Sequence, residues 1–309
     1  VPEGHARLFA KKATTPEEGR ALVHEHFSNG ADQIKLFITG GVFDAEVEGE
    51  PGVLRMPLDI AQAVCEEAHK LGLRTSAHIE STEGVEVGLK AGVDTIEHGA
   101  PLTDELLKLF KKNGLGNASS LTCTLSPALP FAVLSPEKTH STHVQKVNGR
   151  VVYEGVATAT RQALANGIPV GLGTDSACPF VTHYDMWREV VYFQRHTGVT
   201  PEFALHTATL KNAQLLGVAN ETGSIETGKS ADFIVLDVNP LDDLCALRNV
   251  EQVYMAGKPV KYKAKHLPKI DAELDGIMDG LDNDPFVSEW NIAGEKKSLN
   301  PFAKRGAKE

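Results

Sequence analysis

Four separated residues, Lys35, His78, His98 and Asp175, lie within or at the ends of short apolar segments, and all four can take part in metal chemistry. Imidazole nitrogens and carboxylate oxygens are ligands that zinc, manganese and nickel accept. The neutral amine of a lysine can capture carbon dioxide, and the resulting carbamate bridges two divalent metals as a carboxylate does. Asp175 can also take a proton from an attacking water. The set predicts a binuclear metal centre that activates water.

Each of these residues also has an ordinary structural interpretation. A histidine at a strand end is often hydrogen-bonded within the core, and a lysine there often reaches solvent. Asp175 could cap a helix that begins at the following segment SACPF. The common position of all four at strand ends favours the metal centre over four separate structural roles.

The elements that must position these residues alternate between helical and strand patterns, as in parallel βα units. Helices are predicted at 15–29, 57–71, 82–91, 103–112, 151–167 and 200–216. Strands are predicted at 32–38, 73–79, 93–98, 114–122 and 168–175. In a (β/α)8 TIM-type barrel the carboxyl ends of the strands carry the active site, so the pattern predicts this α/β fold.

The sequence pattern changes after Gly217, where short strand patterns are separated by turn residues. We therefore expect three regions: a partial (β/α)8 barrel at 1–217, a small β-sandwich segment at 218–265, and a polar C-terminal tail at 266–309 that forms a surface or an interface.

The composition of the chain limits the classes of molecule that it is expected to bind. The formal charge of −10 and the acidic pI near 5.7 argue against nucleic acid and anionic membranes, which both require a basic surface. The four cysteines contain no CxxC pair, which indicates a reducing, cytoplasmic location. A small molecule is the expected substrate.

Residues 30–260 resemble the amidohydrolase superfamily, and more narrowly its imidazolonepropionase-like and Xaa-Pro dipeptidase (prolidase)-like members. The motifs that carry the resemblance are IKLFITGGV, TSAHIES, GVDTIEHGA, GLGTDS, TPEFALHTATLKNAQLLG and GSIETGKSADFIVLD. The resemblance implies that Lys35 is the carboxylated bridging lysine of strand 4. It also implies that His78 and His98 are ligands after strands 5 and 6, that Asp175 is the strand-8 aspartate, and that the cofactor is two divalent metals, zinc foremost, with manganese or nickel as alternatives.

The chain departs from the family at the first strand, which carries a His-x-His pair in the family. His24 and His26 have this spacing, but they lie within the helix predicted at 15–29, where both rings cannot reach one ion. If Lys35 marks strand 4, we expect strands 1–3 to be absent from this chain. Either the chain is a fragment of a longer protein, or a homo-oligomer or a partner chain supplies the missing strands.

Other candidates are weaker. His183 and Tyr184 follow Asp175 closely enough to contact a substrate, and His140 could do so from a loop shared with His143. A solvated loop is the competing interpretation for His140 and His143. His69 and His206 fall on helices and are expected to be structural, and Cys178 lacks a histidine partner, so packing is its expected role.

The resulting hypothesis is a metal-dependent hydrolase that cleaves an amide bond of a dipeptide, an N-acyl amino acid or a cyclic amide. One alternative is a mononuclear deaminase or cyclic-imide hydrolase of the same superfamily, which would not need Lys35. Another is a non-catalytic scaffold or assembly subunit that keeps the fold.

Overall fold

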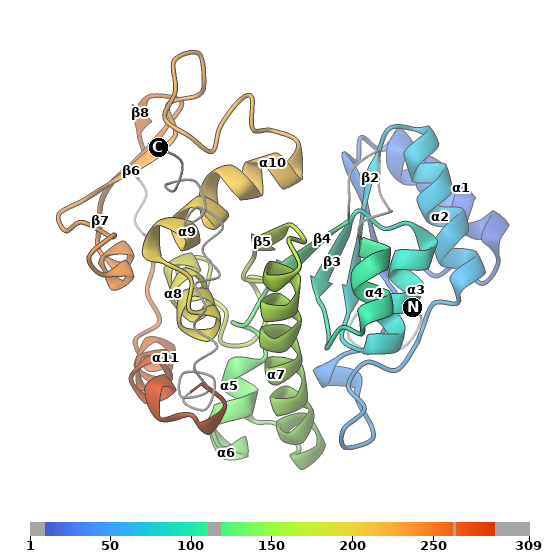
Figure 1. The fold of residues 1–309 in the computed structure, drawn as a ribbon, viewed down its shortest axis with the longest axis horizontal. Helices are drawn as coiled ribbons and strands as arrows, with labels where there is room; N and C mark the ends of the chain where they lie inside the picture. Colours follow the sequence, from blue (N-terminus) through green and yellow to red (C-terminus); the bar gives the residue numbers. More distant parts are fainter. Residues whose placement is uncertain (1–9, 111–118, 262–263, 288–309) are drawn as a thin grey trace, which may run out of the picture. The chain divides into compact units, whose positions relative to one another are not determined.

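The computed structural model describes residues 10–110, 119–261 and 264–287 of the chain. Figure 1 shows the order of the elements. The chain forms two compact units, which comprise Val1–Cys123 with Phe131–Val170 and Thr124–Pro130 with Gly171–Glu309. In the described part of the chain, every helix is too short or too polar to cross a bilayer.

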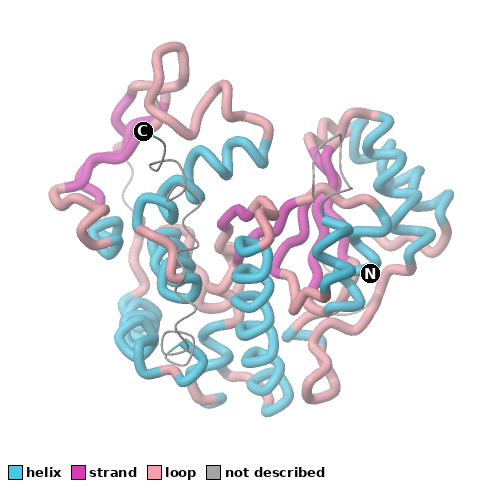
Figure 2. The backbone as a smooth tube through the Cα atoms, in the orientation of Figure 1, coloured by secondary structure: helices cyan, strands magenta, loops and turns pink. Residues whose placement is uncertain are grey.

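The first unit is built on a sheet whose strands lie side by side in chain order, as successive βα units produce. The strands of this sheet are β1 (Gln33–Phe37), β2 (Arg74–Ile79), β3 (Thr95–His98), β4 (Ser120–Cys123) and β5 (Val170–Leu172). β1 to β4 lie in the first unit, and β5 begins at the last residue of that unit, Val170. β1 pairs in parallel with β2, β2 with β3, and β3 with β4. This topology confirms the predicted fold class, strands 4–8 of a (β/α)8 barrel (Figure 2).

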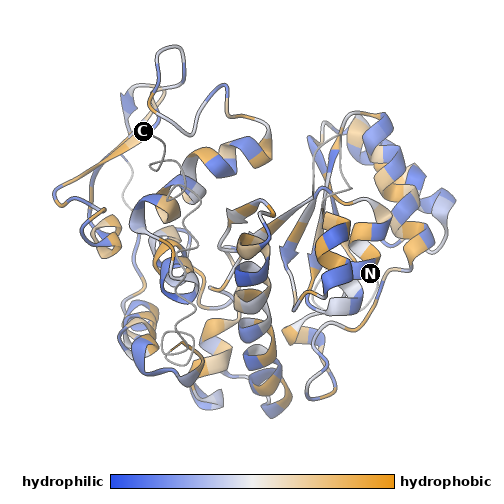
Figure 3. Ribbon diagram, viewed as in Figure 1, coloured by the Kyte–Doolittle hydropathy of each residue, from blue (hydrophilic) through white to orange (hydrophobic). Residues whose placement is uncertain are grey.

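Helices follow the strands and pack in sequence, α1 on α2, α2 on α3, and α3 on α4. Their bounds are α1 (Pro16–Ser28), α2 (Leu58–Lys70), α3 (Thr82–Ala91), α4 (Asp104–Leu109), α5 (Leu129–Val133), α6 (Pro136–Thr139) and α7 (His143–Ala165), with a 3-10 turn at Val42–Asp44. Most carry apolar and polar residues on different faces (Figure 3). Parts of the predicted helix 103–112 and strand 114–122 lie outside the described residues.

Local signals explain where two of these helices begin and end. The Thr15 side chain accepts a hydrogen bond from the Glu18 N–H at 3.2 Å, and Pro16 occupies the first turn of α1. Ser81 caps α3 in the same way, and Gly92 ends it with a φ of 91° that favours glycine. These helices therefore match the sequence prediction closely.

One prediction was wrong in this unit. His143 was placed in a loop with His140, but His143 is the first residue of α7. The Thr142 side chain accepts from the Gln145 N–H, and the Gln145 side chain accepts from the Thr142 N–H, at 3.1 and 3.0 Å. This capping box starts the helix eight residues earlier than its apolar pattern indicates.

The second unit contains helices and a small antiparallel sheet. Its elements are α8 (Met186–Thr197), α9 (Pro201–His206), α10 (Asn212–Leu216), β6 (Phe233–Leu236), β7 (Val250–Met255), β8 (Lys258–Pro259) and α11 (Pro268–Gly280), with 3-10 turns at Leu244–Arg248 and Leu281–Asn283. β7 pairs with both β6 and β8. The predicted region boundaries at 217/218 and 265/266 stay predictions.

The helix predicted at 200–216 contains a π turn, Thr207–Lys211, between α9 and α10. The hydroxyl groups of Thr207 and Thr209 donate to the carbonyls of Phe203 and Leu205 at 2.8 and 2.7 Å. The Phe203 carbonyl also accepts from the Thr207 N–H, and side-chain bonds of this kind are typical of threonine within a helix.

The close approach of α3 to the segment after β1 depends on Gly84. A Cβ at this position would lie 2.3 Å from Thr39 Cγ2. Thr39 is fully buried, and its hydroxyl accepts from the Glu80 N–H at 3.0 Å and donates to the Gly40 carbonyl at 2.8 Å. The Thr39 side chain therefore cannot turn away without losing both bonds.

We expect Gly84→Ala to lower the free energy of unfolding by about 1–3 kcal/mol, because added core volume forces displacement. Chemical denaturation of the full chain measures the change. Gly276→Ala on α11 is the control, since a Cβ there has no neighbour within 4 Å and should leave stability equal or slightly higher. Equal stability of the two variants would contradict the tight packing of α3.

Candidate metal centre

The first two residues of the candidate site lie at the end of β2. His78 and Phe37 are register partners on the paired strands β2 and β1, and their rings lie 5.5 Å apart. Glu80 follows two residues after His78, just beyond the strand. Because alternate residues of a strand share a face, His78 and Glu80 can point to the same side.

His98 ends β3 with an unusual backbone. Strand alternation places Glu97, the register partner of His78, on the face that His78 occupies. His98 nevertheless comes to this face, with its ring centroid 4.8 Å from that of His78. Its φ of 67° is the left-handed conformation that costs a non-glycine residue on the order of 1–3 kcal/mol. Local strain therefore brings the two imidazoles together.

His78, Glu80 and His98 form a compact donor group. One ligating atom from each lies within 4.8 Å of the other two, and both histidines are buried. Two imidazoles with one carboxylate suit a divalent transition metal, and hydrolytic zinc sites use this donor combination. The group therefore fits the metal that the strand-end pattern predicts.

The segment after β1 orients two of these side chains. The Gly40 carbonyl lies 3.1 Å from His78 Nε2, and a carbonyl can only accept, so Nε2 is the protonated nitrogen. In the neutral ring this leaves the lone pair on Nδ1, which can bind a metal. Glu80 Oε2 accepts from the Val42 N–H at 3.1 Å.

Two glycines make room for this arrangement. A Cβ at Gly41 would lie 3.0 Å from Glu80 Oε2 and 3.2 Å from His78 Nε2. A Cβ at Gly52 would lie 2.4 Å from the Glu80 carbonyl carbon, closer than atoms can pack. The absence of both side chains lets the segments after β1 and β2 close around the donor group.

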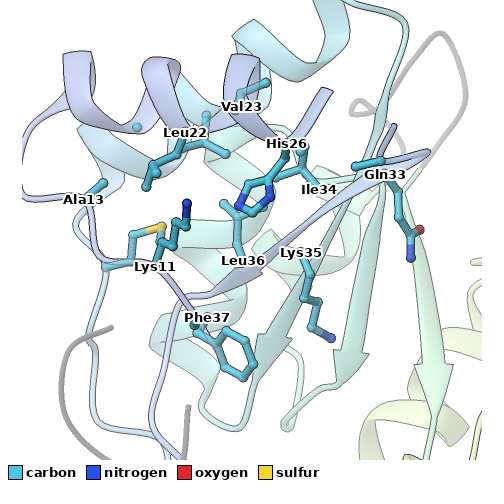
Figure 4. A pocket seen from close by; sticks show the side chains of 15 residues that line it. Lys11, Ala13, Leu22, Val23, His26, Gln33, Ile34, Lys35, Leu36 and Phe37 are labelled. Carbon is cyan, nitrogen blue, oxygen red and sulfur yellow. The ribbon is translucent and has the colours of Figure 1, made fainter. Parts of the chain in front are cut away.

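Lys35 lies on β1 in the same unit. Its register partner is Ser76, two residues before His78, and alternation gives it the face of Phe37. Figure 4 shows Ile34 and Leu36 on the side of α1, while the Lys35 amine points away from that helix. Lys35 is exposed and also borders a cavity of about 300 Å3 next to α1. It therefore shares a sheet face with His78, which lies two register positions farther along the paired strands.

Asp175 belongs to the second unit, three residues after Leu172, the last residue of β5. Its carboxylate accepts from the Cys178 thiol at 3.3 Å, and its side chain is exposed. The residues Asp175, Ala177 and Phe180 all have positive φ, a concentration of strain that is typical of functional loops. The helix-capping interpretation of Asp175 was wrong, because the next helix begins at Met186.

The predicted substrate contacts lie in different parts of the chain. His140 ends α6 in the first unit and is exposed. Exposed His183 contacts the Tyr184 ring at 5.3 Å, and the Tyr184 hydroxyl accepts from the Leu267 N–H and donates to Asp271 at 2.8 and 2.9 Å. Tyr184 thus anchors the start of α11, and the three substrate-binding roles stay predictions.

The helix histidines singled out in the sequence lie apart from the donor group. On α2, His69 Nε2 lies 2.9 Å from Asp94 Oδ2, consistent with a structural role. His206 lies on α9, and burial lowers its pKa. His24 and His26 lie on α1, about 200° apart around its axis, and His24 contacts Glu67 of α2 at 2.9 Å. They do not form one ligand pair.

Glu80 is the member of the donor group that the sequence analysis missed. Its position two residues after His78, at a strand end, was the available signal. A cleft of about 610 Å3 borders it, lined also by Gly99, residues 49–54 and the α7 residues Val151, Val152 and Gly155. Space for a small molecule therefore lies next to the donor group.

Comparison with known proteins identifies the family of this chain. The model of the amidohydrolase family matches residues 6–260. The chain belongs to the amidohydrolase family, as its motifs indicate. It is 27% identical over 249 residues to ochratoxinase from Aspergillus niger, an alignment that covers 79% of this chain and 49% of that protein. The chain thus spans about half the length of this curated relative.

Two solved structures resemble this chain in both fold and sequence. A protein from Bifidobacterium longum, provisionally named a prolidase, is 43% identical with a TM-score of 0.84, over 90% of this chain and 68% of that one. A Xaa-Pro dipeptidase with methionine in its active site is 29% identical with a TM-score of 0.69, over 80% of this chain and 59% of that one.

We expect Gly41→Ala to weaken divalent-metal binding about 10-fold, because its methyl group would press on Glu80 and His78. The extended backbone of Gly41, φ −154°, accepts any residue, so the effect isolates the lost space. Competition with a chromophoric chelator measures the zinc affinity, and Gly276→Ala is again the control. Unchanged affinity of Gly41→Ala would contradict the tight contact.

Proposed function

We propose that this chain is part of a metal-dependent hydrolase that cleaves the C–N bond of an amide, in a dipeptide, an N-acyl amino acid or a cyclic amide. The observation that carries the proposal is the convergence of His78, His98 and Glu80 at the carboxyl ends of parallel strands, beside a cleft. The names of the relatives, ochratoxinase and Xaa-Pro dipeptidase, support a C–N bond as the target.

His78 and His98 would hold the metal, and Lys35, as a carbamate, would bridge it to a second one. Bound divalent metals, zinc or alternatively manganese or nickel, supply a water of lowered pKa and polarise the scissile carbonyl. Asp175 would take the proton of the attacking water and deliver it to the leaving nitrogen as the C–N bond breaks. The face that Lys35 shares with His78 and the strained loop of Asp175 support these roles.

The proposal includes further strands next to β1, from another segment of the protein or from a partner chain. Within the described residues, β1 pairs along one edge only, with β2. A parallel strand added to its other edge would continue the barrel, and closure of the barrel would enclose the face that carries Lys35.

Lys35→Ala should reduce bound metal from about two ions to one in the complete protein and lower hydrolysis about 100-fold or more. Added acetate or propionate should partly restore both, because a free carboxylate can replace the carbamate. Elemental analysis and hydrolysis of a dipeptide panel are the measurements. Lys90→Ala is the control, since Lys90 pairs with Glu86 on the surface of α3.

Unchanged loading of two metals in Lys35→Ala would reject the bridging role. A wild-type protein that holds one metal and hydrolyses a cyclic imide or deaminates a base would favour the mononuclear alternative. The absence of both metal and hydrolysis in the complete protein would favour a non-catalytic scaffold.

Asp175→Asn removes the proton acceptor at constant size, so kcat should fall about 10²- to 10⁴-fold while the protein still binds metal. Steady-state kinetics and elemental analysis of bound metal measure the two quantities. Asp237→Asn, at an exposed carboxylate of the second unit, is the control. Wild-type kcat in Asp175→Asn would refute the acid–base role.

A further inference from the structure

Glu80 lies outside the ligand set to which the proposed function assigns roles, yet it is part of the donor group. We propose that Glu80 is a direct metal ligand together with His78 and His98, so that the first unit carries a histidine–carboxylate–histidine centre. This inference rests on the proposed function in one respect, namely that the site holds a divalent metal.

The distances allow direct coordination. Zinc binds imidazole nitrogen and carboxylate oxygen at about 2.0–2.2 Å in tetrahedral geometry, so the ligand atoms of one ion lie roughly 3.3–3.6 Å apart. One donor atom from each of His78, Glu80 and His98 lies within 4.8 Å of the other two. Side-chain rotations that shorten the longest separation by roughly 1 Å would place all three around one ion.

Glu80 is also held in place as metal ligands are. Its backbone N–H donates to Thr39 Oγ1 at 3.0 Å, and its Oε2 accepts from the Val42 N–H at 3.1 Å. The same segment orients His78 through the Gly40 carbonyl. A carboxylate has several lone pairs, so the bond from Val42 is compatible with coordination and would orient it.

Coordination by Glu80 changes the charge of the site. Two neutral imidazoles leave a divalent ion with its full charge, whereas a carboxylate reduces the net charge to +1 in a buried setting. Burial of that smaller charge is less costly, so the ion binds more tightly. The centre would then retain one metal without the carbamate of Lys35, with open positions for water and substrate.

A competing role is structural: the carboxylate could simply anchor the turn at Val42–Asp44 through its bond to the Val42 N–H. The two roles differ in what they change. Loss of an anchor lowers the stability of the metal-free protein and leaves the coordination sphere intact. Loss of a ligand changes the coordination sphere and the metal affinity.

The experiment compares Glu80→Gln with Glu83→Gln, an exposed glutamate three residues along the chain. Both are made in the full chain in the Lys35→Ala background, where one ion is expected. Zinc affinity is measured by chelator competition, and the visible absorption of bound Co2+ reports the ligand set. Glu80→Gln should weaken zinc binding about 10- to 100-fold and alter the absorption spectrum of bound Co2+. Glu83→Gln should change neither the zinc affinity nor the spectrum.

Three outcomes would overturn the proposal. The first is wild-type affinity and an unchanged Co2+ spectrum in Glu80→Gln. The second is an unchanged spectrum together with lower stability of the metal-free variant, which would make Glu80 an anchor. The third concerns the proposed function itself: if His98→Asn binds zinc as tightly as the wild type, the metal centre lies elsewhere and both proposals fail. If His98→Asn binds zinc more weakly than the wild type and Glu80→Gln does not, Glu80 is not a ligand and the proposed function still stands.

Discussion

Parallel pairing of β1, β2 and β3 is the constraint on which the candidate site depends. In an antiparallel sheet the ends of neighbouring strands lie at opposite edges, so residues that end successive strands would be separated. Parallel register places Phe37 beside His78 and brings Ile79 level with His98. Residues from two loops can then meet without any long side chain crossing the sheet. The covering helices maintain this register through the buried residues of α2 and α3.

The backbone contributes as much to the site as the side chains do. The carbonyl of Gly40 determines which nitrogen of His78 carries the proton, and the N–H of Val42 orients the carboxylate of Glu80. Backbone groups are well suited to this task because they lose little entropy when they hold a partner. The same closeness restricts the residues that can be accepted, which explains glycine at positions 41 and 52. The residues with positive φ, His98 and Asp175, show that the fold tolerates local strain where chemistry is expected.

The two sheets differ in how far their apolar surface is covered. In the first unit the helices bury Ile34, Leu36 and Ile96. In the second unit, β6 leaves Phe233, Ile234 and Val235 between 36% and 45% exposed. Apolar residues on a strand of this kind usually face another layer.

Local signals in the sequence determined much of this structure. The alternation of apolar patterns, the capping residues Thr15 and Ser81 and the helix-ending Gly92 act within a few residues, so the parallel βα order could be predicted. The positions of His78 and His98 at strand ends followed from the same patterns. The capping box that starts α7 is equally local, but its signal was overlooked because the apolar pattern begins later.

Only the tertiary structure decided which side chains meet. Glu80 joins the donor group because a segment 38 residues away holds its carboxylate, and no spacing within TSAHIES reveals that contact. His98 reaches His78 through a left-handed backbone that strand alternation argues against. The sequence by itself therefore determined the elements and the chemistry available at their ends, since these depend on neighbouring residues. Convergence on one point depends on contacts between distant segments, and these exist only in the folded chain.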